Sequence, residues 1–445
     1  MNTYRLFLIL FTTSFFGFSQ EAPVGYTLNE AIAFALENNY SALNADRDII
    51  DAQKQKWETI ASGLPQISAD LNYQNQLKQP VSLIPAEFFG GQPGEFQAIV
   101  FGQPQQASAT ATVRQQIFDG SYIVGVQATK AFLSYSRNNK EKTQQDVRKA
   151  VVEAYGNVLL AKESVTILQK NLDALQSNLY ETQKLYENGL AEEENVEQLQ
   201  ITFSTVESQL KNAQRLQNIT LQMLNLVMGL PIEDETQLKE DLNDLAQAYV
   251  DPAALNTPFS MENNVDYKLV NNLNEQRYFE LKLAKSRALP TLNAFANYGT
   301  AAFSNSFTFL DGDQQWYDSS ILGFDLSIPI FSSLKRSAST QRAKIALEKA
   351  KTQLTETQER IRLQLEKAKS DYLLAIEQYA TTQQNLNLAE RIEQKNQIKY
   401  KEGIASSFEL RQAQTQLYTA QQEYLQSMVD VINTKTELEV IANNQ

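Results

Sequence analysis

A seven-residue repeat of apolar side chains is the feature that most constrains how this chain can fold. Apolar or aromatic residues recur at alternating steps of four and three from Val147 to Tyr186, interrupted only by Thr182. A period of 3.5 residues is typical of a coiled-coil seam rather than of an ordinary globular helix. At 1.5 Å per residue, the helix predicted from about residue 120 to 188 is roughly 100 Å long.

The repeat occurs twice in the chain. The seam recurs in register 214 residues later, from Ile361 to Tyr400, and weakens only in its last turns. The two long helices end in matching motifs, "YENGLA" at 186–191 and "YKEGIA" at 400–405, after which apolar seams resume. Glycine adopts a left-handed backbone at little cost, so each motif predicts the tip of a helical hairpin, near 189 and near 403.

A period of two marks four other segments. Apolar and polar side chains alternate in residues 66–77, 107–118, 291–301 and 320–331, and each segment has roughly the length of a strand that crosses an outer membrane. The intervening segments, about 79–106 and 302–318, read as loops; the first is rich in Gly and Pro. Aromatic residues near the strand ends fit either an interfacial girdle or ordinary sheet packing.

These elements define two structural repeats. Residues 21–229 and 263–445 each read as helix, strand, loop, strand and helical hairpin, and a proline-marked connector at 230–262 joins them. Residues 1–20 combine one Arg, an apolar run and small polar residues, which predicts a cleaved signal peptide; a short membrane anchor is the alternative.

Composition excludes several classes of function. The chain has no Cys and no His, which removes thiolate nucleophiles, imidazole bases and nearly every zinc site. No nucleotide-binding glycine motif is present, and nothing marks a pair of carboxylates as catalytic, so we expect neither an enzyme nor a bound cofactor. A net charge of −13 argues against nucleic acid as a partner.

Four amphipathic strands cannot close a barrel alone, and lipid does not tolerate open sheet edges. Several copies must therefore share one barrel. Two copies supply eight strands, at which size side chains fill the interior, whereas three supply twelve and leave room for a pore. The sequence predicts an internally duplicated α+β membrane protein with amphipathic β-strands and long coiled-coil helices.

The duplicated "LP" strand entries at 64–65 and 289–290, the junction "IPIFSSLKRSASTQRAKIALEKA" and the two tip motifs resemble the TolC-like outer-membrane efflux and export channels. The resemblance covers essentially the whole mature chain. It implies a homotrimer with a 12-stranded β-barrel in the outer-membrane lipid and an α-helical tunnel in the periplasm. It further implies a passive exit channel for a tripartite efflux pump or a type I secretion system.

The resemblance also implies partners: an inner-membrane pump and a periplasmic membrane-fusion adaptor protein, which meets the hairpin tips and opens them. The alternative for the tips is a simple helix turn, and both can hold. The adaptor-facing positions correspond to Tyr186, Gly189, Leu190, Ala191, Tyr400, Gly403, Ile404 and Ala405.

Glu409 is the candidate gate of the periplasmic aperture, because family members carry acidic residues on the second hairpin; a second such position falls on Gln412 and is not acidic here. Ser406 and Glu409 also form an S-x-x-E capping box, so gate and cap both remain open. A secreted coiled-coil structural or adhesive protein without a pore is the alternative function, although it leaves the four matched strands unexplained. The sequence does not identify the exported substrate.

Overall fold

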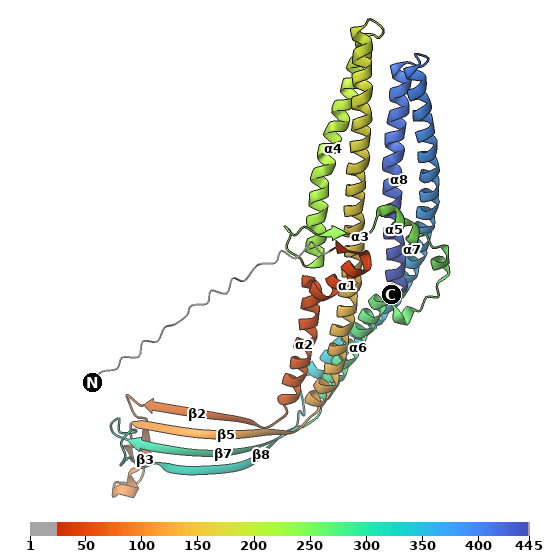
Figure 1. Ribbon diagram of the computed structural model, residues 1–445. Helices are drawn as coiled ribbons and strands as arrows, with labels where there is room; N and C mark the ends of the chain where they lie inside the picture. Colours follow the sequence, from red (N-terminus) through yellow and green to blue (C-terminus); the bar gives the residue numbers. More distant parts are fainter. Residues whose placement is uncertain (1–24, 444–445) are drawn as a thin grey trace, which may run out of the picture. The chain divides into compact units, whose positions relative to one another are not determined.

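The computed structural model describes residues 25–443 (Figure 1), so the predicted signal peptide lies outside the described residues. The described chain forms two compact units. A helical unit comprises residues 25–43, 144–258 and 365–443, and a sheet unit comprises residues 44–143 and 259–364. Neither unit coincides with one sequence repeat, because each contains segments from both.

The sheet unit contains the four alternating segments as one antiparallel sheet in the order β2-β5-β7-β8. The strands are β2 (Gln66–Asn75), β5 (Gln105–Asp119), β7 (Thr291–Ser304) and β8 (Tyr317–Ser327). The last strand ends four residues before the predicted limit of 331. Pro329 offers no backbone N–H to a ladder, and Ser333 and Leu334 take positive φ values of 46° and 64° as the chain turns toward the next helix.

The sheet has one apolar and one largely polar face. Ile67, Val113, Ala296 and Leu322 lie opposite one another in a row across the four strands. Large side chains on this face remain exposed, with Leu71 at 85% and Leu322 at 76%. Within the described chain, β2 and β8 each have one neighbour in this sheet, so both of its edges are unpaired.

The segment predicted as a loop at 79–106 contains a β-hairpin that the sequence analysis did not anticipate. Strand β3 (Val81–Pro85) pairs antiparallel with β4 (Phe96–Val100), and the short helix η1 (Ala86–Phe89) lies between them. Gly90 and Gly94, with φ values of 82° and 91°, make the turn. The many glycines and prolines of this segment predicted a loop, and the two strands, each only five residues long, were not recognised among them.

The second loop, between β7 and β8, folds onto the apolar face at the end of the sheet. Phe309 is buried with Ala107 and Ala302. The ring centroids of Phe307 and Phe309 lie 5.5 and 5.7 Å from the ring centroid of Tyr73. At this end the aromatic residues are therefore packed against one another as well as placed at a strand end.

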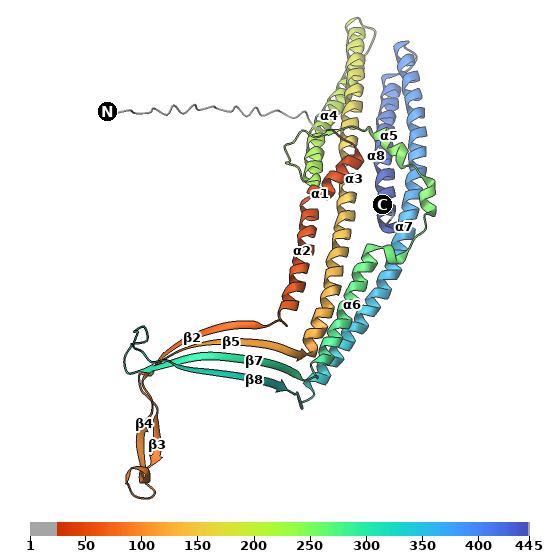
Figure 2. The ribbon, with the colours of Figure 1, turned by 60° about the horizontal axis from the view of Figure 1, so that its bottom comes forward.

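Helices complete the sheet unit and continue from its strands (Figures 1 and 2). They are α2 (Tyr40–Ala61), α6 (Val265–Ser286), the first part of α3 (Gly120–Glu187) and the first part of α7 (Lys335–Lys401), with η3 (Met261–Asn263) before α6. At 68 and 67 residues, α3 and α7 are each roughly 100 Å long, as the seam predicted. No helix in the described range 25–443 is long and apolar enough to span a membrane.

The helical unit contains two hairpins, in which α3 pairs with α4 (Glu193–Met228) and α7 with α8 (Ser407–Ala442). Heptad positions are buried, for example Val151 at 0% and Val431 at 0% exposure. The unit also holds α1 (Leu28–Asn38), α5 (Leu242–Tyr249), η2 (Pro252–Asn256) and a parallel pair, β1 (Gly25–Tyr26) with β6 (Gln237–Leu238).

Candidate functional site: the tips of the helical hairpins

The first tip is a left-handed helix end built around Gly189. Gly189 has a φ of 72°, its N–H donates to the carbonyl of Tyr186 at 2.9 Å, and the N–H of Leu190 donates to the carbonyl of Leu185 at 2.8 Å. This pair of bonds is the Schellman motif, which pairs carbonyls that the helix end would otherwise leave free. A Cβ at Gly189 would meet nothing within 4 Å, so the backbone angle alone requires glycine.

The second tip repeats this geometry. Gly403 has a φ of 70° and donates to the carbonyl of Tyr400 at 3.0 Å, while Ile404 donates to that of Lys399 at 2.8 Å. Here too a Cβ on the glycine would lie in open space. The matching motifs in the sequence therefore form matching turns, each of which reverses a long helix.

The two tips present an apolar side chain to solvent at the same position. Leu190 and Ile404 follow the two glycines, and each is 75% exposed. Their neighbours Ala191 and Ala405 are half-buried. Since neither exposed side chain is used for packing within the chain, both are available to a partner.

The paired tyrosines differ in role, which the sequence could not show. Tyr186 is exposed, whereas Tyr400 is half-buried and its hydroxyl lies 3.0 Å from Oγ1 of Thr182 in the other hairpin. Thr182 is the polar interruption of the first seam and is fully buried. The interruption thus connects the two hairpins by a hydrogen bond close to their tips.

Glu409 caps the returning helix α8. The backbone N–H of Ser406 donates to Oε2 of Glu409 at 2.8 Å, and the N–H of Glu409 donates to Oγ of Ser406 at 3.3 Å, which completes a capping box. The hydrogen bond from the Ser406 amide, helped by its hydroxyl, holds the pKa of Glu409 below its usual range. The carboxylate is fully exposed, so capping does not remove its charge from water.

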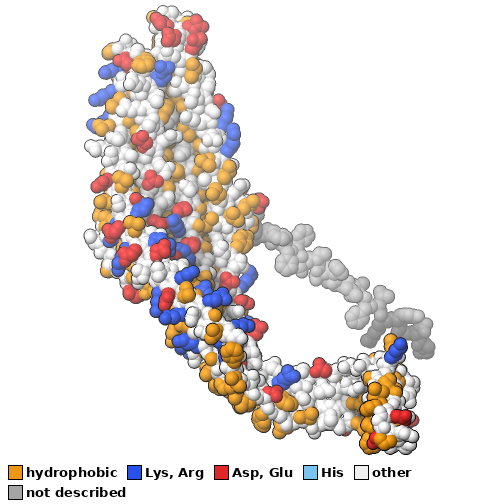
Figure 3. Space-filling model, turned by 180° about the vertical axis from the view of Figure 1, so that it is seen from behind, with side chains coloured by type: hydrophobic (Ala, Val, Ile, Leu, Met, Phe, Trp, Pro, Cys, Tyr) orange, Lys and Arg blue, Asp and Glu red, His pale blue; other side chains and the backbone are white. Residues whose placement is uncertain are grey.

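Acidic residues also begin α4 at the other tip. Glu192 precedes the helix without a side-chain capping bond, and Glu193 and Glu194 lie in its first turn. Negative charge in a first helical turn interacts favourably with the helix dipole. Figure 3 shows acidic side chains gathered at the free end of this hairpin. These glutamates give that end a negative surface.

Polar and apolar contacts both join the two hairpins. Asn171 donates to Oε1 of Gln421 at 2.9 Å, and Lys401 lies 3.3 Å from Glu181. Within the first hairpin, Leu175, Leu199 and Val206 form a buried apolar cluster, and Tyr418 of α8 packs against it. This cluster stabilises the first hairpin and also contributes to its contact with the second.

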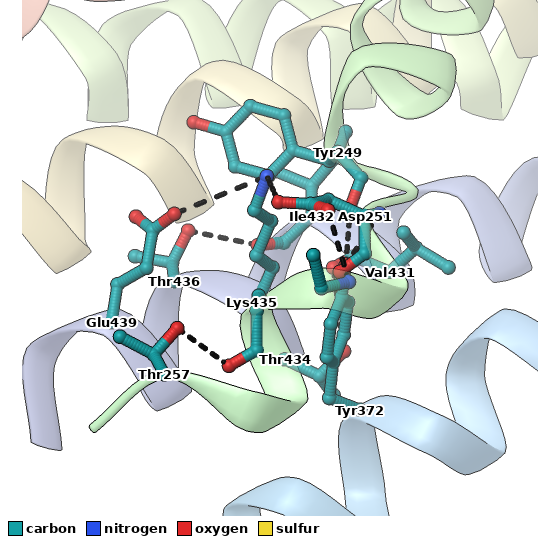
Figure 4. A network of polar contacts seen from close by, with 12 residues as sticks. Tyr249, Asp251, Thr257, Tyr372, Val431, Ile432, Thr434, Lys435, Thr436 and Glu439 are labelled. Carbon is teal, nitrogen blue, oxygen red and sulfur yellow. Dashed lines mark hydrogen bonds and ion pairs between the residues drawn. The ribbon is translucent and has the colours of Figure 1, made fainter. Parts of the chain in front are cut away.

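The connector is fastened to the second hairpin by a buried tyrosine (Figure 4). The hydroxyl of Tyr372 accepts from the N–H of Asp251 at 2.8 Å and donates to the carbonyl of Tyr249 at 2.7 Å. Tyr372 is a heptad position with 0% exposure. The sequence marked it as part of the seam but gave no sign of its polar partners, which lie more than 120 residues away.

A charged cluster surrounds this fastening. The ammonium group of Lys435 lies 3.9 Å from Asp251, 4.0 Å from Glu439 and 5.1 Å from the ring centre of Tyr249. Its side chain is only 12% exposed. Burial raises the pKa of Glu439, which the positive charges of Arg148 and Lys435 counteract. Burial also raises the pKa of Tyr249 to about 12.

An amphipathic antiparallel sheet and two long helical hairpins in one chain define a class of protein, the outer-membrane channels that have a strand part and a helical part. The sequence profile described as "Outer membrane efflux protein" matches residues 31–230 and 275–444. The chain therefore belongs to the outer membrane efflux protein family, a family of transport proteins rather than of enzymes. It lies in the outer membrane and extends into the periplasm, and the resemblance noted in the sequence is confirmed.

Two curated relatives are secretion proteins. The alkaline protease secretion protein AprF of Pseudomonas aeruginosa is 21% identical over 344 residues, which cover 75% of this chain and 69% of AprF. The proteases secretion protein PrtF of Dickeya chrysanthemi is 21% identical over 252 residues, covering 55% of this chain and 53% of PrtF. The chain thus matches about half the length of PrtF and rather more of AprF.

Solved structures show the same fold. The outer membrane protein VceC of Vibrio cholerae is similar with a TM-score of 0.70 at 16% identity, over 93% of this chain and 95% of VceC. The CmeC outer membrane channel of Campylobacter jejuni gives a TM-score of 0.72 at 17% identity, over 93% of this chain and 85% of CmeC. Strands and helical hairpins in this order are thus a fold that outer-membrane channels adopt.

Proposed function

We propose that three copies of this chain form one channel, in which each contributes its four-stranded sheet to a 12-stranded barrel. The carrying observation is the sheet itself, which has two unpaired edges and an exposed apolar face. Lipid does not tolerate open edges, so β8 of one copy pairs with β2 of the next until the sheet closes. The apolar face then meets lipid, and the polar face lines a hydrated lumen.

The helical hairpins continue this lumen as a tunnel in the periplasm. The repeats at 21–229 and 263–445 place one hairpin each in the tunnel wall, and the connector at 230–262 joins them. The channel is a passive conduit, and an inner-membrane pump supplies the energy. Buried heptad seams favour this arrangement, because side-by-side hairpins build a wall by coiled-coil packing.

The tips are the docking positions for a periplasmic adaptor protein. The exposed Leu190 and Ile404 supply apolar contacts, and the acidic start of α4 supplies charge next to them. An adaptor that binds the tips of separated hairpins better than those of closed ones shifts the channel toward the open state. Glu409 lines the aperture in the closed state, where its charge selects cations, in addition to capping α8.

The exported substrate depends on the pump that the channel serves. AprF and PrtF are named for the secretion of proteases, which favours a type I secretion system and a polypeptide substrate for this chain. A tripartite efflux pump for small molecules uses a channel of the same fold. Identification of the pump that co-purifies with the adaptor distinguishes the two.

The mass of the purified mature protein in mild detergent tests the proposal. We expect three copies per particle by light scattering, a band that shifts on heating in gel electrophoresis, and ion conductance in planar bilayers. We also expect an adaptor to co-purify with the wild-type protein and not with a Leu190→Asp, Ile404→Asp double variant. A monomer, or a protein that partitions into water without detergent, would refute the channel and leave a coiled-coil structural protein.

A further inference from the structure

The hairpin β3–β4 has one face made entirely of apolar side chains. Its register places three pairs on this face: Val81 with Val100, Leu83 with Ala98, and Pro85 with Phe96. These side chains are exposed, with Leu83 at 66% and Phe96 at 64%. The opposite face contains polar members, namely Ser82 and Gln97.

The rest of the segment is also apolar and nearly uncharged. Residues 79–104 carry only two charges, Glu87 and Glu95, and both lie in the turn outside the strands. Phe88 and Phe89 at the tip are 80% and 58% exposed. Figure 3 shows hydrophobic side chains gathered at the end of the sheet unit that carries this hairpin. A patch of this kind marks a binding surface rather than a loop that remains in water.

No part of the described chain covers this face. Ala86 is the only buried residue between positions 79 and 104. Isolated two-stranded hairpins are marginally stable in water and need another surface to pack against. The hairpin is nevertheless regular, with five consecutive residue pairs. It therefore requires a partner outside its own chain.

The hairpin leaves the sheet on the side of the polar face. The loop between β7 and β8 marks the apolar face, because its Phe309 packs on Ala107 and Ala302 there. In Figure 2 that loop rises above the strand ends, whereas the hairpin β3–β4 points down on the other side. In the proposed barrel the polar face lines the lumen, so the hairpin extends inward over the mouth of the pore.

The hairpin is long enough to reach the centre of the mouth. Twelve strands spaced about 4.8 Å apart and tilted about 40° give a circumference of roughly 75 Å and a radius of roughly 12 Å. Strands of five residues at about 3.4 Å per residue are roughly 17 Å long before the tip is added. Three such hairpins in a threefold barrel cannot avoid one another at the axis.

We propose that the three β3–β4 hairpins of the trimer pack by their apolar faces across the outer mouth of the barrel and narrow it. The partner of each hairpin is thus the same hairpin of the neighbouring copies. This inference rests on the proposed trimeric channel. It adds a second constriction, at the end of the sheet where β2 ends and β5 begins.

Cysteine cross-linking tests the contact directly, because the chain has no native cysteine. Leu83→Cys places a thiol on the apolar face, and Ser82→Cys places one on the opposite face of the same strand as a matched control. We expect mild oxidation of intact trimers to join two copies through Leu83→Cys and not through Ser82→Cys. A disulfide requires Cα atoms within about 7 Å, so only a close approach of the hairpins gives this result.

Access to the lumen from outside the cell tests the constriction. Thr110→Cys lies on the polar face of β5 and reports entry of a bulky, membrane-impermeant maleimide added to intact cells. We expect its labelling to accelerate severalfold when Leu83→Lys is added, and not when Ser82→Lys is added. Replacement of residues 80–103 by two glycines should accelerate the labelling to the same extent. Because this variant lacks the hairpin altogether, misfolding of the hairpin cannot explain its result. This reporter is independent of the state of the periplasmic end.

The remaining outcomes separate the proposals. If the particle is not a trimer, the proposed function fails. A different result overturns only this inference. In that case the particle is a trimer, the Leu83→Cys copies do not cross-link, and the rate of Thr110→Cys labelling does not depend on the hairpin. Strong quenching of a Phe88→Trp variant by brominated lipids also overturns it, since lipid and not another hairpin then covers the face.

Discussion

Replacing Tyr372 with phenylalanine isolates the fastening between the connector and the second hairpin. The change removes one hydroxyl and leaves the buried ring in place. Two hydrogen bonds are lost, one from the amide of Asp251 at 2.8 Å and one to the carbonyl of Tyr249 at 2.7 Å. A half-buried amide without a partner costs about 1–3 kcal/mol, so we expect local opening to become easier by about 2 kcal/mol.

Hydrogen exchange with mass spectrometry measures this opening. About 2 kcal/mol corresponds to roughly 30-fold faster exchange, since 1.36 kcal/mol is a factor of ten. We expect the acceleration in peptides that contain the Asp251 amide and not in peptides from the tip at Gly403. The global stability of the protein should change much less, because the heptad seam around Tyr372 remains packed.

Tyr155→Phe is the matched control in the first repeat. Tyr155 is also fully buried, and its hydroxyl lies 3.0 Å from the carbonyl of Tyr26 and 3.1 Å from Oε2 of Glu240, within hydrogen-bond distance of both. Its loss should release the segments around Tyr26 and Glu240 and leave the exchange at Asp251 unchanged. Unchanged exchange at Asp251 in Tyr372→Phe, or equal effects of both variants at both segments, would refute the fastening as a local clasp.

Four further predictions concern the tips and the charged cluster. Glu409→Gln should raise single-channel conductance in planar bilayers while Ser406→Ala, which keeps the charge, should not; equal effects would leave Glu409 as a cap alone. Because the Ser406 amide lowers the pKa of Glu409, the cap's stabilisation should be complete above pH ~4.3 and fade only as pH falls through that lowered pKa, as exchange in the first turn of α8 would report. Gly403→Ala forces a side chain into a φ of 70° and should loosen the tip by about 1 kcal/mol, with a smaller effect for Gly403→Asn, again measured by exchange. Lys435→Met removes a cation beside Glu439, whose pKa burial already raises. Ionisation of Glu439 should then destabilise the cluster, so the amides of the connector should exchange faster as pH rises from 5 to 8. Connector exchange rates that do not change with pH, after correction for the intrinsic pH dependence of exchange, would contradict this role of the cluster.

Most of the fold could be predicted from local periodicity in the sequence. The 3.5-residue seam around Val151 predicts a long paired helix, and the alternation around Leu71 predicts a two-faced strand, because both patterns report which side chains must leave water. The tip at Gly189 was equally predictable, since a left-handed turn favours glycine and leaves a local signature. The capping box at Ser406 and Glu409 was readable for the same reason, as its partners are three residues apart.

The sequence left open whatever depended on a distant partner. Tyr186 and Tyr400 occupy equivalent motifs, yet only the second meets Thr182. In the sequence Tyr372 is one more apolar member of the heptad seam, and only the structure shows that Asp251 lies beside its hydroxyl. Glycines and prolines at 79–106 suggested an irregular loop, and only the pairing of β3 with β4 revealed a hairpin. Contacts between distant residues leave no periodic pattern in the sequence, so they could not be predicted from local patterns.

The sequence alone determined the long helices, the four strands of the main sheet and the hairpin tips, and therefore the family of outer-membrane efflux proteins to which the chain belongs. The tertiary structure alone decided that each compact unit combines both repeats and that the connector is clasped to the second hairpin. It also decided that an uncovered apolar hairpin extends from the end of the sheet. The physical reason is that burial and backbone angle are set by neighbours within a few residues, whereas hydrogen-bond and packing partners are set by where the remote chain comes to lie.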